Sequence, residues 1–325
     1  MLTPQTPNID GVLIQWGDRL FYPGNWIVRG RALPKMHGKS MSERAATIRA
    51  RIEATVVRRA PQVMVKVTGG GRGMKAIAAH FRYISKNGRL DIEDERGEKI
   101  RGKDVLRELA DEWRFGGTLI DDISPWREAF NVMLSMPRGT DPLPLQRAAR
   151  EFAKVELADH KYVMVLHDHQ ANPHVHISVR AESRHGKRLN PRKSDLQRWR
   201  ETFAEKLREQ GIDAEATRQA TRGASKNYEP LWRIKAREDE RLRSHGADSG
   251  TKSSPRARTT RVQAAEAWEH VARALAVSGD KADRDLAQSI TTSLWDKPAV
   301  EMLDRTVRTT EIVLPAKSRD VDEYR

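Results

Sequence analysis

The sequence contains no cysteine among its 325 residues, and this absence excludes several kinds of chemistry. Disulfide frameworks, zinc sites with thiolate ligands and thiol nucleophiles all require cysteine, so histidine or carboxylate side chains must hold any bound metal. Long apolar runs are also absent, since none approaches the roughly 20 residues that a membrane span needs. The first residues lack the basic and apolar regions of a signal peptide. We therefore expect a cytoplasmic protein without membrane insertion.

Acidic residues are the scarcer charged class, with 45 Asp and Glu against 59 Lys and Arg and a formal net charge of +14. A basic excess favours polyanionic partners, because each neutralised phosphate releases condensed counterions and strengthens binding. A soluble basic protein without a nucleic-acid partner can have the same composition. Charge alone therefore leaves both interpretations open.

The order of the predicted elements indicates the fold class. Alternating apolar residues predict strands in residues 62–68, 130–136, 161–167 and 174–181. Apolar residues at helical spacing predict helices in residues 40–59, 73–87, 104–114, 141–157 and around Leu196–Leu207. We expect an α+β fold with a central, mainly antiparallel sheet flanked by helices, and with a helical C-terminal segment. Residues 11–22 we interpret as a short strand or a core segment.

Six of the ten histidines fall between His160 and His185. His174 and His176 stand two apart in a predicted strand and therefore project from the same face, while His167 ends the preceding strand. Three imidazoles can thus converge from two adjacent strands and leave coordination positions open, as a catalytic metal requires. The alternative is three ordinary polar residues on a solvated strand. No H-E-x-x-H helix occurs, which argues against a zincin.

Residues 167–176, HDHQANPHVH, resemble the third motif of MOBP-type conjugative relaxases, the MobA/VirD group of HUH endonucleases. That motif commonly reads H-x-D-x-x-x-P-H-x-H, and the three histidines named above match its ligand positions. His169 stands where the family has an acid that orients a ligand, and Asp168 comes one position earlier. The resemblance therefore implies a metal centre but leaves open whether Asp168 has the orienting role.

A second resemblance concerns a tyrosine near the start of the predicted domain. Residues 65–94 resemble the first relaxase motif, a glycine-rich turn and a helix ending in Tyr-[Ile/Leu]-Ser-[Lys/Arg]-x-Gly, and residues 83–88, YISKNG, fit it at every position. Of five tyrosines, Tyr83 lies about 180° around its helix from Met74 and off the apolar stripe. A half-exposed helical tyrosine without a role would show the same pattern. The resemblance implies that Tyr83 is the nucleophile, and His80, one turn earlier, could accept its proton.

The order of the two motifs distinguishes between related enzymes. Rolling-circle replication initiators and related transposases place the tyrosine after the histidine motif, whereas relaxases place it before, as this sequence does. The resemblance covers about residues 60–240, which we take as the relaxase domain. Residues 1–59 then form a basic N-terminal extension, residues 241–261 a linker and residues 262–325 a small helical C-terminal segment.

The resemblance implies a bacterial enzyme that nicks and rejoins one DNA strand at an origin of transfer through a 5′-phosphotyrosine intermediate. It implies a divalent metal, Mg or Mn, and as partners single-stranded or supercoiled DNA, relaxosome accessory proteins and a type IV secretion coupling protein. Basic residues beside the two motifs are candidates for phosphate contacts: Arg72, Lys75, Lys86, Arg89, Arg188 and Arg192. The alternatives are a non-enzymatic basic DNA-binding accessory protein and a rolling-circle initiator or transposase.

Overall fold

The computed structural model describes residues 8–22, 36, 38–223 and 255–295. The chain divides into two compact units: residues 59–216 form one, and residues 1–58 together with residues 217–325 form the other. Each unit has a buried hydrophobic core of its own among the described residues.

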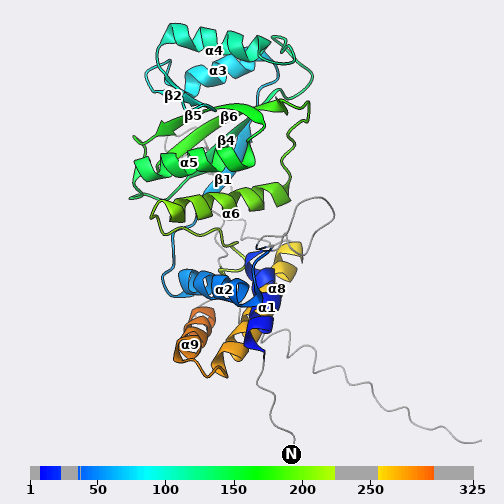
Figure 1. Ribbon diagram of the computed structural model, residues 1–325, viewed down its shortest axis with the longest axis vertical. Helices are drawn as coiled ribbons and strands as arrows, with labels where there is room; N and C mark the ends of the chain where they lie inside the picture. The colour runs from blue at the N-terminus through cyan, green and yellow to red at the C-terminus, as the bar shows by residue number, and fades with distance from the viewer. Residues whose placement is uncertain (1–7, 23–35, 37, 224–254, 296–325) are drawn as a thin grey trace, which may run out of the picture. The chain divides into compact units, whose positions relative to one another are not determined.

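A six-stranded antiparallel sheet forms the centre of the unit made by residues 59–216, with the order β1-β4-β6-β5-β2-β3 (Figure 1). The bounds are Met64–Gly69 (β1), Ile92–Asp94 (β2), Lys99–Ile100 (β3), Ala129–Ser135 (β4), His160–His167 (β5) and His174–Ser183 (β6). The four long strands lie where apolar alternation predicts them. Alternation does not predict β2 and β3, because such short strands cannot display a period. The expected α+β fold with a mainly antiparallel sheet is confirmed.

Helices cover both faces of this sheet (Figure 1). The helices α3 (Met74–Ile84) and α4 (Lys103–Phe115) pack on one face, and α5 (Pro142–Glu156) and α6 (Lys193–Glu209) pack on the other. Asp141 caps α5 by accepting from the Leu143 backbone N–H at 3.0 Å, with proline at the first helical position as expected.

Strand β6 divides its side chains between the two faces. Val175, Ile177 and Val179 are fully buried in the core beneath α5 and α6. Because successive side chains of a strand point to opposite faces, His174 and His176 lie on the face that carries α3 and α4. The same apolar alternation that builds the core therefore decides which helices the two histidines meet.

The second unit is helical and consists of α1 (Ile9–Phe21), α2 (Met41–Val56), α8 (Pro255–Ala276) and α9 (Lys281–Trp295). The short strand considered for residues 11–22 is wrong. The Asn8 side chain accepts from the Gly11 backbone N–H at 3.0 Å and begins α1, which buries Leu13, Leu20 and Phe21 at helical spacing. A short apolar run flanked by few polar residues cannot by its pattern be assigned to helix or strand.

The helical unit joins segments from both ends of the sequence. Residues of α1, α2, α8 and α9 share one core, although the sequence suggests an N-terminal extension and a separate C-terminal segment. Helix α8 begins at Pro255, within the range predicted as a linker, while residues 224–254 and 296–325 lie outside the described part of the chain. None of the described helices is both long and apolar enough to cross a membrane.

Candidate active site

Three histidine side chains meet at the hairpin end of strands β5 and β6. The register places His167, the last residue of β5, opposite His174, the first residue of β6, with His176 two residues further along. The ring centroids lie 4.6 to 5.0 Å apart, and one nitrogen of each ring lies within 4.8 Å of the other two. All three residues are buried. The convergence expected from the sequence is therefore present.

Backbone carbonyl groups orient two of these rings. Because a carbonyl oxygen only accepts, His167 Nε2–H must donate to the carbonyl of Ile84 at 2.7 Å. In the same way, His174 Nδ1–H donates to the carbonyl of Asn172 at 2.9 Å. The lone pairs of His167 Nδ1 and His174 Nε2 are then left for another ligand. A hydrogen bond on the opposite nitrogen is what holds metal-binding imidazoles in place.

Two buried ring nitrogens of the cluster have no hydrogen-bond partner, namely His167 Nδ1 and His176 Nδ1. Burial lowers the pKa of His167, and burial together with the neighbouring imidazoles lowers the pKa of His176 to about 3. Both rings are thus neutral at pH 7, with lone pairs available. Leaving polar atoms buried and unpaired is costly, so three convergent imidazoles with these unpartnered nitrogens fit a bound divalent metal.

Tyr83 and His80 lie beside this cluster on the last turns of α3. The Tyr83 ring centroid is 6.3 Å from that of His176, and the His80 ring is 6.1 Å from Tyr83 and 6.4 Å from His176. Tyr83 is 69% exposed, as its place off the apolar stripe predicts. His80 Nε2 is buried without a hydrogen-bond partner, and burial lowers the pKa of His80 to about 4. An accessible phenol therefore stands next to a neutral imidazole and the three-histidine cluster.

The end of α3 shows why Tyr-Ile-Ser-Lys-Asn-Gly suits this position. The Ser85 hydroxyl, fully buried, donates to the Phe81 carbonyl at 2.7 Å and accepts from the Gly88 backbone N–H at 3.0 Å. The three residues 86–88 all have positive φ, and a Cβ on Gly88 would come within 2.6 Å of the Gly102 backbone. This left-handed turn ends the helix and leaves the Ile84 carbonyl, which follows Tyr83, aimed at His167.

Asp168 and His169, which lie at or beside the acidic position of the family's third motif, are exposed, whereas the three candidate ligands are buried. His169 is exposed, with its ring 5.2 Å from that of His167. Asp168 is exposed in the hairpin loop, and its side chain forms no hydrogen bond or ion pair with any described residue. The carbonyls of Ile84 and Asn172 orient rings instead. Sequence reasoning missed both, because every residue has a carbonyl and no side-chain signal marks the one that is used.

The candidate phosphate-binding residues form two groups. Arg72, Lys75, Lys86 and Arg89 are exposed at the two ends of α3. Beyond β6, Arg188 is paired with Glu128 at 3.1 Å and Glu182 at 3.4 Å, and Arg192 is exposed at the start of α6. The first group lies within or next to the helix that carries Tyr83, and its members form no ion pair with any described residue, whereas Arg188 is paired with two carboxylates.

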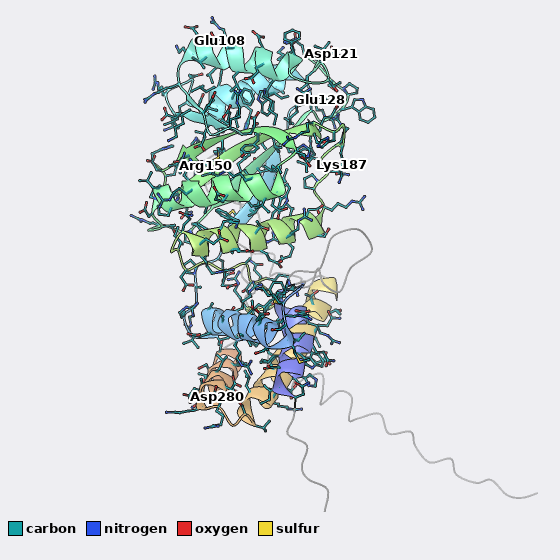
Figure 2. The ribbon with its side chains drawn as sticks, in the orientation of Figure 1. Glu108, Asp121, Glu128, Arg150, Lys187 and Asp280 are labelled. Carbon is teal, nitrogen blue, oxygen red and sulfur yellow. The ribbon has the colours of Figure 1, made fainter. Side chains whose placement is uncertain are left out.

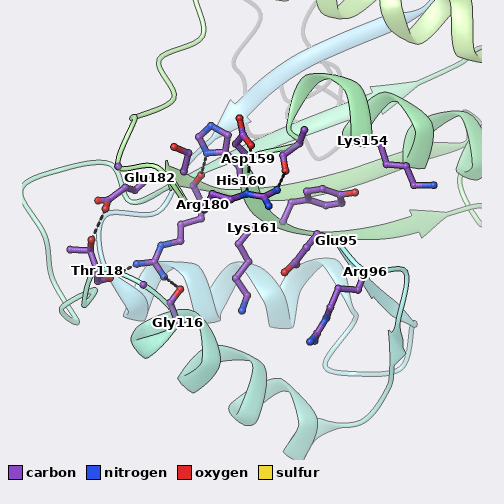
Figure 3. Close-up of a pocket in the computed structure, with 16 residues that line it drawn as sticks. Glu95, Arg96, Gly116, Thr118, Lys154, Asp159, His160, Lys161, Arg180 and Glu182 are labelled. Carbon is purple, nitrogen blue, oxygen red and sulfur yellow. Dashed lines mark hydrogen bonds and ion pairs between the residues drawn. The ribbon is translucent and has the colours of Figure 1, made fainter.

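A cavity of about 720 Å³ lies at the other end of β5 and β6, away from the three histidines (Figure 3). Arg180 crosses it and donates to the carbonyls of Trp113 at 2.7 Å, Gly116 at 3.3 Å and Thr118. Another cation on its wall, Lys161, is paired with Glu112 at 2.5 Å. These contacts tie α4 to the sheet, so we interpret Arg180 as structural.

One comparison with known proteins found a similarity to a family. Residues 83–212, less than half of the chain, match the family model described as relaxase, MobA/VirD2-like, nuclease domain. The match begins at Tyr83 and includes all three histidines of the cluster. No curated protein matches the chain.

Proposed function

We propose that this protein, whose residues 83–212 match the MobA/VirD2-like relaxase nuclease domain, nicks and rejoins one DNA strand in conjugative mobilisation, through a covalent bond to Tyr83. The observation that carries the proposal is the exposed Tyr83 ring, 6.3 Å from the ring of His176 in a buried cluster of three imidazoles. A nucleophile and a metal-binding set on one face of the sheet are the two parts that such a reaction needs.

In the proposed reaction the Tyr83 oxygen attacks a DNA phosphorus in line with the 3′ oxygen that leaves. One phosphorus–oxygen bond forms and one breaks, so a 5′-phosphotyrosine and a free 3′-hydroxyl result. His80, whose Nε2 is unpartnered and whose ring is 6.1 Å from that of Tyr83, is the proposed acceptor of the phenol proton. The leaving 3′ oxygen takes up a proton from solvent. Because the new phosphodiester retains the bond energy, attack by a 3′-hydroxyl on the phosphotyrosine rejoins the strand.

His167, His174 and His176 are the proposed ligands of a divalent metal. A metal bound there would polarise the scissile phosphate and offset the charge on its oxygens. Magnesium prefers oxygen ligands, whereas imidazole nitrogens suit manganese and later transition metals, so three imidazoles favour Mn over Mg. The carbonyls of Ile84 and Asn172 would keep the lone pairs of two ligands directed at the ion.

The partners follow from the proposed reaction. The substrate is single-stranded or supercoiled DNA at an origin of transfer, and accessory proteins of a relaxosome and a type IV secretion coupling protein would act with the enzyme. The exposed cations at the ends of α3, the helix that carries Tyr83, are proposed phosphate contacts: Arg72, Lys75, Lys86 and Arg89. Such contacts position the strand and give affinity without reading its sequence.

A covalent adduct is the direct test of this proposal. Labelled single-stranded origin-of-transfer DNA is incubated with the protein and Mg or Mn, and the products are separated on a denaturing protein gel. We expect a labelled band at the combined mass of protein and DNA for the wild type and for Tyr162→Phe, a buried tyrosine of β5, and no band for Tyr83→Phe. Absence of an adduct from the wild type with either metal would favour a DNA-binding accessory protein.

A second experiment separates a metal site from a structural cluster. Replacing both His174 and His176 with Ala should abolish cleavage and leave non-specific DNA affinity largely intact, because phosphate contacts come from arginine and lysine side chains. Affinity is measured by fluorescence anisotropy at fixed salt concentration. An equal loss of binding and cleavage would mean that the histidines maintain the fold.

A further inference from the structure

Exposed apolar side chains concentrate in the α4–β4 connection, residues 116–128, and in the last residue of α4. Trp126 is 69% exposed and Ile123 is 79% exposed, and Phe115 and Leu119 are exposed as well. Single exposed apolar residues are common, but several in one short segment indicate an interaction surface.

Backbone hydrogen bonds hold this connection in one conformation. The N–H groups of Met74 and Lys75, at the start of α3, donate to the carbonyls of Asp121 at 2.9 Å and Asp122 at 3.3 Å. Gly73 has φ +93°, and a Cβ there would lie 2.4 Å from the Asp122 carbonyl oxygen, so the close approach requires glycine. The Ser124 hydroxyl accepts from the Trp126 N–H at 3.1 Å. The indole is thus presented to solvent by an ordered segment.

Two exposed arginines lie near Trp126: Arg127 is the next residue, and Arg72 contacts the residue before it. Arg72 donates to the Pro125 carbonyl at 3.3 Å, and the Arg127 guanidinium lies 5.1 Å from the centroid of the Phe130 ring. Among the described residues, neither arginine forms an ion pair with a carboxylate. An exposed aromatic ring near two arginines that form no ion pair has the chemistry of a single-stranded nucleic-acid contact, in which a base stacks on the ring and phosphates meet the cations.

Two nearby acidic side chains have their charges compensated. Asp122 is paired with Arg114, and Glu128 is paired with Arg188 at 3.1 Å. Asp121 and Glu128, which lie within the connection, appear close to one edge of this unit in Figure 2. Asp121 is exposed and forms no ion pair with any described residue, so the unpaired charges of this segment are those of Arg72, Arg127 and Asp121. Their balance is positive, which suits a polyanion better than a basic partner.

The connection is continuous with the proposed active site. Helix α3 starts against it at Met74 and carries Tyr83 nine residues later, which is about 13 Å along the helix axis. Met74 and Ile120, a residue of the connection, belong to the core on the sheet face that carries the three histidines. A DNA strand with its phosphate at Tyr83 could therefore reach the connection within a few nucleotides.

We propose that the α4–β4 connection is a base-stacking platform for single-stranded DNA, with a base on the indole of Trp126 and neighbouring phosphates at Arg72 and Arg127. The inference rests on the proposed function and adds to it a base contact at Trp126, which lies outside the two relaxase motifs. The platform gives affinity for the strand and tolerates different bases, because every base has a π face.

The test measures binding of the full chain to a fluorescein-labelled oligothymidylate and to an abasic strand of the same length. We expect Trp126→Ala to weaken binding of the oligothymidylate about 5- to 100-fold and to leave binding of the abasic strand unchanged, because only a base can stack. Trp126→Phe should restore most of the affinity. Leu143→Ala, a comparably exposed apolar residue on α5, is the matched control and should bind like the wild type.

A further variant examines the phosphate contact. Arg127→Gln should weaken binding of both strands and reduce the magnitude of the slope of log affinity against log salt concentration by about 1. The platform would be refuted if Trp126→Ala binds the oligothymidylate as tightly as the wild type does, or if its affinity for the abasic strand falls by the same factor. The exposed apolar residues of the connection would then be better explained by a protein partner. The proposed function would survive that result if the Tyr83 adduct still forms. A wild type that binds neither strand would instead refute the proposed function, and the platform with it.

Discussion

Replacing His176 with Leu should remove the metal response of the protein without destabilising its metal-free form. His176 is 8% exposed, and its Nδ1 atom is buried with no hydrogen-bond partner. An unpaired buried polar atom costs about 1–3 kcal/mol, whereas leucine has a similar size and no polar atom. The free energy of unfolding of the metal-free variant should therefore be unchanged or higher by up to about 2 kcal/mol.

The metal-bound form should respond in the opposite way. A ligand at 100 times its dissociation constant stabilises the native state by about 2.7 kcal/mol. For a unit of this size that corresponds to a rise in Tm of roughly 5–10 °C. We expect Mn to produce such a rise in the wild type, measured by differential scanning calorimetry of the full chain, and to produce little or none in His176→Leu.

His160→Leu is the matched control for this experiment. His160 lies at the other end of β5 and donates from Nδ1–H to the Arg180 carbonyl at 2.9 Å. Losing that hydrogen bond should cost about 1 kcal/mol in both the presence and the absence of metal, with the Mn-dependent rise retained. If the metal-free His176→Leu protein loses 2 kcal/mol or more and Mn has no effect on the wild type, the cluster is structural and our reasoning about its unpaired nitrogens is wrong.

Two other substitutions test the turn that ends α3 and the independent unfolding of the two units. Ser85→Ala leaves the buried Gly88 N–H without its 3.0 Å acceptor, so the free energy of unfolding measured in urea should fall by about 1–3 kcal/mol. Mn should also bind more weakly in a calorimetric titration, because the Ile84 carbonyl is held less firmly against His167. Ser85→Ala with wild-type Mn affinity would show that the turn does not support the ligand. Trp268→Phe removes the donor of the 2.7 Å hydrogen bond to the Thr221 carbonyl, so the free energy of unfolding of the helical unit should fall by about 1 kcal/mol. The Mn-dependent rise in Tm should remain. If that rise disappears, the two units do not unfold separately.

Much of the sheet unit could be predicted from the sequence because its signals are local. Apolar alternation marks the four long strands, and helical spacing buries Met74, Ile77, Phe81 and Ile84 on one side of α3. Tyr83 lies off that stripe and is exposed. The same kind of reasoning failed for residues 11–22, where a short apolar run without a clear period forms helix α1 and not a strand.

The sequence by itself determined that two histidines share one face of a strand and that a tyrosine stands on the open side of a helix. Those features depend on the period of a strand and of a helix, which neighbouring residues set. Only the tertiary structure decided that the Ile84 carbonyl contacts His167 across 83 positions, and that His80 and Tyr83 lie beside His176. It likewise decided that Trp126 is exposed to solvent and that Arg72 contacts the carbonyl of the neighbouring Pro125 across 53 positions. These contacts join residues distant in the chain, and packing and loop conformation bring them together.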